Sequence, residues 1–123
     1  MARILVIDDD PLVAATFKIM LAKQNHEPVA AGSCHLALQK LSLDRFDMAF
    51  CDMIMPDVEG LETINRIRKI DPTMPIIAMS GGGRTGKLDF LQIAKKAGAN
   101  DILRKPFSAI ALTQVIDAHI NPA

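Results

Sequence analysis

Short apolar runs alternate along the chain with longer segments in which apolar residues recur at every third or fourth position. The short runs have the length and composition of buried strands, and the longer segments have the spacing of one apolar helix face. The pattern predicts five strands, at residues 3–7, 28–31, 47–51, 75–79 and 102–104. A predicted helix follows each strand, so the chain consists of five successive strand-helix units.

Several predicted helices begin with residues that suit a helix N-terminus. Asp10 is the expected N-cap of the first helix, with Pro11 in the first helical position, and Ser33 and Ser108 open the second and last helices. The side chains expected to form the apolar helix faces are Leu12, Val13, Thr16, Phe17, Met20 and Leu21 in the first helix, Ala37, Leu38 and Leu41 in the second, Leu61, Ile64 and Ile67 in the third, Leu88, Leu91 and Ala94 in the fourth, and Leu112, Val115, Ile116 and Ile120 in the last.

Repeated strand-helix units favour parallel strands joined by right-handed crossovers. We therefore predict an α/β fold in which helices cover both faces of an open sheet. The 123 residues fit one core of ordinary size, about 100–150 residues. No repeat, low-complexity tract or linker interrupts the pattern, so we expect residues 1–123 to form a single domain.

The chain carries 14 basic and 14 acidic residues, a net charge of zero. Direct binding of nucleic acid or an anionic membrane normally requires a basic excess, so neither is expected. A charge-free stretch such as residues 72–83 is shorter than the roughly 20 residues that span a bilayer. The N-terminus shows no signal peptide, and two cysteines make no disulfide framework. We expect a cytoplasmic protein with reduced thiols.

The charges are nevertheless unevenly placed. Residues 1–60 carry nine acids and five bases, whereas residues 61–123 carry five acids and nine bases. Polar side chains also follow the predicted strands, where an open parallel sheet gathers its functional groups. They are Asp8 and Asp9 after the first strand, Asp52 after the third, Ser80 after the fourth and Lys105 after the fifth. We expect these five side chains to share one pocket.

Ionised carboxylates in one pocket repel each other, by about 4 kcal/mol per pair at 4 Å and an effective dielectric near 20. Carboxylate oxygens without nearby histidine or cysteine ligands favour Mg²⁺, for which Mn²⁺ can substitute. Such a metal commonly binds a phosphoryl group as well, and then Lys105 and Ser80 are suited to contact phosphate oxygens. One carboxylate would remain as a nucleophile that forms an acyl phosphate.

Four segments carry a family resemblance: ILVIDDDP at 4–11, FCDMIMPD at 50–57, IIAMS at 76–80 and GANDILRKPF at 98–107. In order and spacing they resemble the receiver domain of two-component response regulators, especially the stand-alone, chemotaxis-regulator-like members. The resemblance implies a flavodoxin-like (βα)5 fold with strand order 2-1-3-4-5. It also implies phosphorylation of an aspartate by a histidine kinase or a histidine phosphotransfer protein.

The resemblance assigns roles to individual residues: Asp52 matches the phosphoacceptor, Asp8 and Asp9 the acidic pair that holds Mg²⁺, the backbone carbonyl of Ile54 a further metal ligand, Ser80 the switch hydroxyl and Lys105 the phosphate-pairing lysine. Gly60 matches a common glycine, and Lys105–Pro106 a peptide bond that is often cis. Two positions depart from the family pattern. Ile102 replaces a frequent Tyr or Phe, which argues against an aromatic-rotation switch, and Gly81–Gly83 predicts a loop that phosphorylation would order.

Taken together, these features predict a phosphorylation-dependent signalling switch, a phosphoprotein with an aspartyl phosphate. It would phosphorylate and dephosphorylate itself with Mg²⁺ but have no turnover substrate, so we do not expect an enzyme. Since the receiver fills the chain and leaves no output domain, the signal would leave through contact with a downstream protein target. The candidate contact face comprises the fourth helix, the fifth strand and the last helix.

Two other interpretations compete with this one. Residues 81–87 satisfy the pattern G-x-x-x-x-G-K of a nucleotide-binding loop, but Leu88 stands where such a loop needs Ser or Thr. Asp8 and Asp10 have the D-x-D spacing of a haloacid dehalogenase-like phosphatase, but an acidic pair beyond Lys105 is missing and Asp52 would have no role. In the phosphatase, phosphate would be attached to Asp8.

Overall fold

A five-stranded parallel sheet forms the middle layer of the protein. The computed structural model describes residues 1–54, 59–81 and 87–120. The strands are β1 (Arg3–Ile7), β2 (Glu27–Ala31), β3 (Met48–Asp52), β4 (Ile76–Ser80) and β5 (Asp101–Arg104). Their order is β2-β1-β3-β4-β5 and each neighbouring pair is parallel, which confirms the predicted flavodoxin-like topology.

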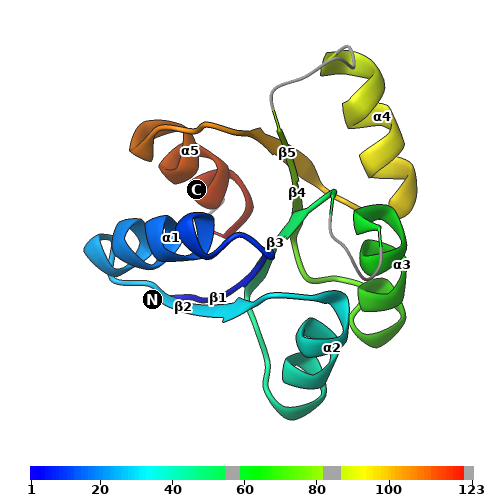
Figure 1. Cartoon of the computed structure of the whole chain (residues 1–123), viewed down its shortest axis with the longest axis horizontal. Coiled ribbons are helices and arrows are strands. Elements are labelled where there is room, and N and C mark those ends of the chain that lie inside the picture. Colours follow the sequence, from blue (N-terminus) through cyan, green and yellow to red (C-terminus); the bar gives the residue numbers. More distant parts are fainter. Residues whose placement is uncertain (55–58, 82–86, 121–123) are drawn as a thin grey trace.

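Helices cover both faces of this sheet (Figure 1). They are α1 (Pro11–Lys23), α2 (Cys34–Leu43), α3 (Gly60–Ile70), α4 (Lys87–Ala97) and α5 (Ala109–Ile120). Helices α1 and α5 lie on one face, and α2, α3 and α4 lie on the other. None of the helices in the described ranges is long and apolar enough to cross a membrane.

Alternate residues of the strands supply the two apolar layers. In β1, Ile4 and Val6 pack with α1 and α5, whereas Leu5 and Ile7 pack with the opposite layer. Phe17 of α1 lies between Phe50 of β3 and Phe107, with ring centroids 5.0 and 4.9 Å apart. Because both faces of the inner strands β1, β3 and β4 are buried, these strands are mostly apolar, as the sequence pattern predicted.

The helix N-termini are capped as expected. The Asp10 carboxylate accepts the Leu12 backbone N–H at 2.9 Å, with Pro11 in the first turn. The Ser33 hydroxyl accepts from Leu36 N–H at 3.1 Å, and the Ser108 hydroxyl accepts from Ala111 N–H at 3.0 Å. These bonds satisfy N–H groups that have no partner within the helix.

Two details differ from the prediction. The predicted apolar face of α1 was wrong at Leu12, which is 76% exposed, and at Thr16, which is also exposed. Phe17 and Leu21 on the same predicted face are buried. Strands β3 and β4 lie one residue later than predicted, so Asp52 and Ser80 are the last residues of their strands, and β2 and β5 each begin one residue earlier than predicted. The side chains of Leu88 and Leu91 lie outside the described part of the chain.

At the edge of the sheet where the strands begin, Arg68 holds three segments together. Its guanidinium donates to the carbonyl oxygens of Met74 (2.6 Å), Gly98 (2.8 Å) and Asp71 (3.3 Å), and to the Asn100 side-chain oxygen (2.8 Å). The same Asn100 oxygen accepts the first N–H of β4, from Ile76, at 2.9 Å. Arg68 therefore joins the end of α3 to the start of β4 and to the turn between α4 and β5.

Candidate functional site

Three carboxylates meet at the carboxyl ends of neighbouring strands. Asp8 follows β1 and Asp52 ends β3, and the register pairs Ile7 with Cys51, which places the two aspartates side by side. One carboxylate oxygen from each of Asp8, Asp9 and Asp52 lies within 4.8 Å of the other two. The Asp8 side chain is completely buried, Asp52 is nearly so, and Asp9 is exposed. The structure thus brings together the three predicted acidic residues.

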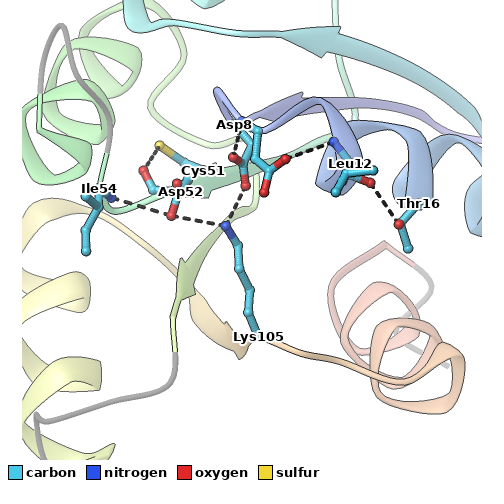
Figure 2. Close-up of polar contacts among 8 residues, drawn as sticks. Asp8, Leu12, Thr16, Cys51, Asp52, Ile54 and Lys105 are labelled. Atoms are coloured by element: carbon cyan, nitrogen blue, oxygen red, sulfur yellow. Dashed lines mark hydrogen bonds and ion pairs between the residues drawn. The ribbon is translucent and has the colours of Figure 1, made fainter.

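Lys105 adds a cation to these carboxylates. Its side chain extends from the end of β5 to a position between Asp8 and Asp52 (Figure 2). The Lys105 Nζ atom lies 2.6 Å from Asp8 Oδ2 and 3.4 Å from Asp52 Oδ1. The Lys105 backbone N–H donates to the Ser80 carbonyl at 2.7 Å, and the Lys105–Pro106 peptide bond is cis. Four of the predicted side chains therefore form one charged cluster.

Burial and mutual repulsion shift the protonation equilibria in this cluster. The pKa of Asp52 is raised, chiefly by burial and then by the charge of Asp8, while Lys105 and the Ile54 N–H act in the opposite direction. Burial acts to lower the pKa of Lys105, but its hydrogen bond to Asp8 and the charges of Asp52 and Asp8 outweigh that effect, and its pKa is raised. The Lys105 ammonium thus stays charged and partly compensates the carboxylates.

The donor set fits a hard divalent cation. Three carboxylates and one ammonium leave two uncompensated negative charges when all four groups are ionised. A search of the aspartate, glutamate, cysteine and histidine side chains in the described ranges gives Asp8, Asp9 and Asp52 as a group close enough together to hold a metal ion. All three donors are carboxylate oxygens. Oxygen donors favour Mg²⁺ or Mn²⁺ over softer metals. The residues present therefore fit the metal that the sequence predicted.

Ile54 and Ser80 lie at the same edge of the sheet. Ile54 is 79% exposed, and its backbone nitrogen is 3.5 Å from Asp52 Oδ1, a long contact. Ser80 ends β4, one residue beyond Met79, which pairs in register with Asp52. Metal binding by the Ile54 carbonyl and phosphate contact by the Ser80 hydroxyl stay predictions. The loop expected from Gly81–Gly83 falls mostly outside the described residues.

Asp10 has a role that the sequence reasoning missed. Its backbone N–H donates to Asp8 Oδ1 at 2.9 Å, so it holds the Asp8 carboxylate in place. An aspartate that bonds a backbone N–H two residues later is a common turn, and this was the signal that could have been used. The Asp10 side chain meanwhile caps α1 and is not one of the three clustered carboxylates. This argues against the D-x-D phosphatase interpretation.

Gly60 shows why a glycine stands at the start of α3. A Cβ atom on Gly60 would lie 2.4 Å from Met53 Cα and 2.6 Å from the Asp52 carbonyl oxygen, closer than side-chain atoms come to backbone. The Gly60 N–H also donates to the Met53 carbonyl at 3.1 Å. Helix α3 therefore begins in direct contact with the backbone that carries Asp52.

Ile102, at the position where an aromatic residue is frequent, is partly buried and packs against the apolar layer under α2, α3 and α4. Cys34 and Cys51 are buried, and the two thiols are not joined by a disulfide. Residues 82–86 of the possible nucleotide-binding loop lie outside the described ranges, so the structure does not test that alternative.

Curated relatives cover nearly the whole of this chain. The response regulator protein FleR of Pseudomonas aeruginosa is 31% identical over 118 residues, which are 96% of this chain and 24% of FleR. The DNA-binding transcriptional regulator NtrC of Azospirillum brasilense is 33% identical over 120 residues, 98% of this chain and 24% of NtrC. The chain thus spans about a quarter of the length of these two relatives.

Solved structures agree with this similarity. The chemotaxis protein CheY4 of Vibrio cholerae superposes with a TM-score of 0.88 at 26% identity, covering 97% of this chain and 98% of CheY4. A response regulator receiver domain protein of Clostridium thermocellum superposes with a TM-score of 0.87 at 34% identity, covering 98% of this chain and 95% of that protein's chain. The family model of the response regulator receiver domain matches residues 4–117. With its fold, its acidic cluster and these matches, the chain belongs to the response regulator receiver domains of two-component systems.

Proposed function

We propose that this protein is a signalling switch that accepts a phosphoryl group on Asp52 from a histidine kinase or a histidine phosphotransfer protein. The observation that carries the proposal is the position of the Asp52 carboxylate, which shares one cluster with two further carboxylates and the Lys105 ammonium. Family membership implies phosphoryl acceptance on an aspartate, and Asp52 is the clustered aspartate at the end of the central strand β3.

In the proposed reaction, the Asp52 carboxylate attacks the phosphorus of a phosphohistidine. A P–O bond forms, the P–N bond breaks, and the departing imidazole nitrogen keeps the electron pair and takes up a proton. Asp8, Asp9, Asp52 and the Ile54 carbonyl would hold a Mg²⁺ ion. That ion would supply positive charge to the phosphoryl oxygens.

The remaining charge would be met by Lys105 and Ser80. Phosphorylation adds about −1.5 to −2 charges at the strand ends. Lys105 Nζ lies 3.4 Å from Asp52 Oδ1 and can pair with a phosphoryl oxygen attached there. The Ser80 hydroxyl, at the end of the adjacent strand, would donate a hydrogen bond to another oxygen. Movement of Ser80 toward the phosphate would pull the backbone that leads into α4 in the same direction.

The output would be a change in protein contacts, with the face of α4, β5 and α5 as the docking surface for a downstream protein. Direct nucleic-acid or membrane binding is not proposed, because the chain carries no excess of positive charge.

We further propose that residues 1–123 form one receiver domain, supported by the match over residues 4–117. Cytoplasmic location, the usual one in this family, completes the proposal.

Labelling tests the acceptor directly. The protein would be incubated with acetyl phosphate and with phosphorylated kinases, with and without Mg²⁺, and the modified residue would be identified by mass spectrometry. We expect Mg²⁺-dependent labelling of wild type and of Asp117→Asn, an exposed site on α5, but not of Asp52→Asn. Labelling of Asp8, or undiminished labelling of Asp52→Asn, would overturn the proposal.

A further inference from the structure

Helix α4 ends at a glycine in the left-handed region of backbone conformation. Gly98 has φ +118°, its N–H donates to the Lys95 carbonyl at 3.1 Å, and the Ala99 N–H donates to the Ala94 carbonyl at 3.0 Å. These two bonds together form the cap that commonly closes a helix at a glycine. They satisfy carbonyls of the last helical turn and turn the chain toward β5, which begins at Asp101.

Arg68 of α3 holds the turn that follows this cap. Its guanidinium donates to the Gly98 carbonyl oxygen and to the Asn100 side-chain oxygen, both at 2.8 Å. Asn100 is bonded to the first residue of β4, because its N–H donates to the Ile76 carbonyl at 2.7 Å and its side-chain oxygen accepts the Ile76 N–H at 2.9 Å. The arginine stem also packs on the turn, since a Cβ atom on Gly98 would lie 2.8 Å from Arg68 Cγ. The end of α4 is therefore fastened to α3 and to the sheet.

Apolar packing adds to the anchorage of this end of α4. Ala94 is completely buried, and Ala97 packs against the same apolar layer of the core. Figure 1 shows the last turn of α4 next to α3, with the first turn further from α3. Hydrogen bonds from a charged donor such as Arg68 are roughly twice as strong as those between neutral groups. A displacement of α4 should therefore be resisted most at its last turn.

We propose that Arg68 makes the last turn of α4 a pivot, so that α4 swings about this end when Asp52 is phosphorylated. The proposal rests on the proposed function, in which movement of Ser80 pulls the backbone that leads into α4. A short helix moves as a rigid rod because its internal hydrogen bonds resist bending, so displacement grows with distance from Gly98. The first half of α4 would then carry the change that a downstream protein detects, while Lys96 in the last turn stays nearly in place.

The swing can be measured as two distances that change by different amounts. A spin label at Lys18 of α1 is paired with a second label at either Gln92 or Lys96 of α4, and all three positions are exposed. Beryllium fluoride with Mg²⁺ supplies a phosphoryl-like group on Asp52, and pulsed EPR gives each distance before and after its addition. A protein without introduced cysteines serves as the control for labelling of the native, buried thiols.

The distance to Gln92 should change more than the distance to Lys96. At 1.5 Å per helical residue, Gln92 lies about 9 Å and Lys96 about 3 Å from Gly98, so the first change should be about three times the second. Equal changes would mean that α4 moves as a whole, and would overturn the proposal. This comparison uses the wild-type contacts of Arg68 and needs no substitution there.

A substitution then tests whether Arg68 is the cause. Arg68→Met removes the donors but keeps an aliphatic stem, so the last turn should be released and the two distances should change by about the same amount. Arg66→Met, at an exposed position of the same helix, should keep the ratio of about three. Circular dichroism establishes that each variant is folded. An unchanged ratio in folded Arg68→Met would show that other contacts hold α4, and would overturn the role of Arg68.

Failure of the pivot and failure of the proposed function give different results. If acetyl phosphate labels Asp52 but beryllium fluoride changes neither distance, the pivot is overturned while the acceptor stands. If Asp52 is not labelled, the proposed function fails and the pivot fails with it.

Discussion

The Asp52 carbonyl oxygen lies 2.6 Å from the point where Gly60 would carry a Cβ atom. The first residue of α3 is therefore packed against the backbone of the proposed phosphoacceptor, with no room for a side chain. Since the nearby atoms belong to the backbone, they cannot move aside as the end of a side chain would. The position of α3 and the position of Asp52 are thus coupled at this contact.

We predict that Gly60→Ala will destabilise the protein by about 1–3 kcal/mol, the usual range for overpacking, and will slow the labelling of Asp52 by acetyl phosphate. Urea unfolding and the labelling rate measure the two effects. Gly32→Ala is the matched control, because nothing lies within 4 Å of its added Cβ. Equal stability of the two variants would show that the backbone beneath Asp52 yields easily.

Asp52→Asn should stabilise the protein at neutral pH. The folded-state pKa of Asp52 is raised, chiefly by burial and by the charge of Asp8. A carboxyl group with a raised folded pKa binds protons more readily in the folded state, so its contribution to stability falls as pH rises above about 4, the unfolded value. Replacing the group by an amide removes this loss.

The pH profile checks this prediction. Urea unfolding at pH 7.5 should show Asp52→Asn more stable than wild type, and the difference should shrink as the pH falls through about 4, because the carboxyl group becomes protonated in both states below that pH. Asp117→Asn, at an exposed position, should show no such trend. A difference that is constant with pH would exclude ionisation of Asp52 as its cause.

Arg68→Met should cost about 2–3 kcal/mol of stability. The guanidinium donates to three carbonyl oxygens and to the Asn100 side chain, and the substitution leaves those acceptors without their charged donor. Arg66→Met is the matched control on the same helix. Its guanidinium forms an exposed pair with Glu62 at 3.0 Å, for which we expect a loss of about 0.5 kcal/mol or less. Thermal or urea unfolding distinguishes the two.

Asp10 should tolerate substitution by another capping residue. In Asp10→Ser the hydroxyl can still accept the Leu12 N–H, and the backbone bond from residue 10 to Asp8 is retained. Stability should then stay close to wild type, whereas Asp10→Ala should lose about 1 kcal/mol. Labelling of Asp52 should continue in Asp10→Ser. Loss of labelling there, with stability intact, would instead support a catalytic D-x-D pair.

Much of the fold could be predicted because the inner strands β1, β3 and β4 are buried on both faces and several helix starts carry their own caps. Asp10, Ser33 and Ser108 mark three helix starts through local hydrogen bonds that depend on sequence neighbours alone. The face of α1 was harder, since Leu12 and Ile19 are apolar yet exposed, at 76% and 60%. A helix with apolar residues on several sides does not indicate by spacing which side is buried.

The acidic cluster was predictable because parallel topology alone brings the strand ends together. The partner of Lys105 was not, since the choice between Asp8 and Asp52 depends on the lysine rotamer and on differences of less than 1 Å. The Arg68 contacts were also missed. Three of its acceptors are backbone carbonyls, which every residue has, so no sequence signal marks them.

Contacts on both sides of Lys105 hold its backbone in place, so its side chain and the surrounding helices can move on different timescales. The Phe107 ring lies 4.9 Å from that of Phe17, and two residues earlier the Lys105 N–H is bound to the Ser80 carbonyl, so the backbone on both sides of Lys105 is anchored. Only side-chain torsions then remain free at Lys105. Such rotations take on the order of nanoseconds, whereas shifts of whole helices take microseconds or longer. Charge at the site can therefore rearrange before a helix shifts, so the slower helix motion would set the speed of the proposed switch.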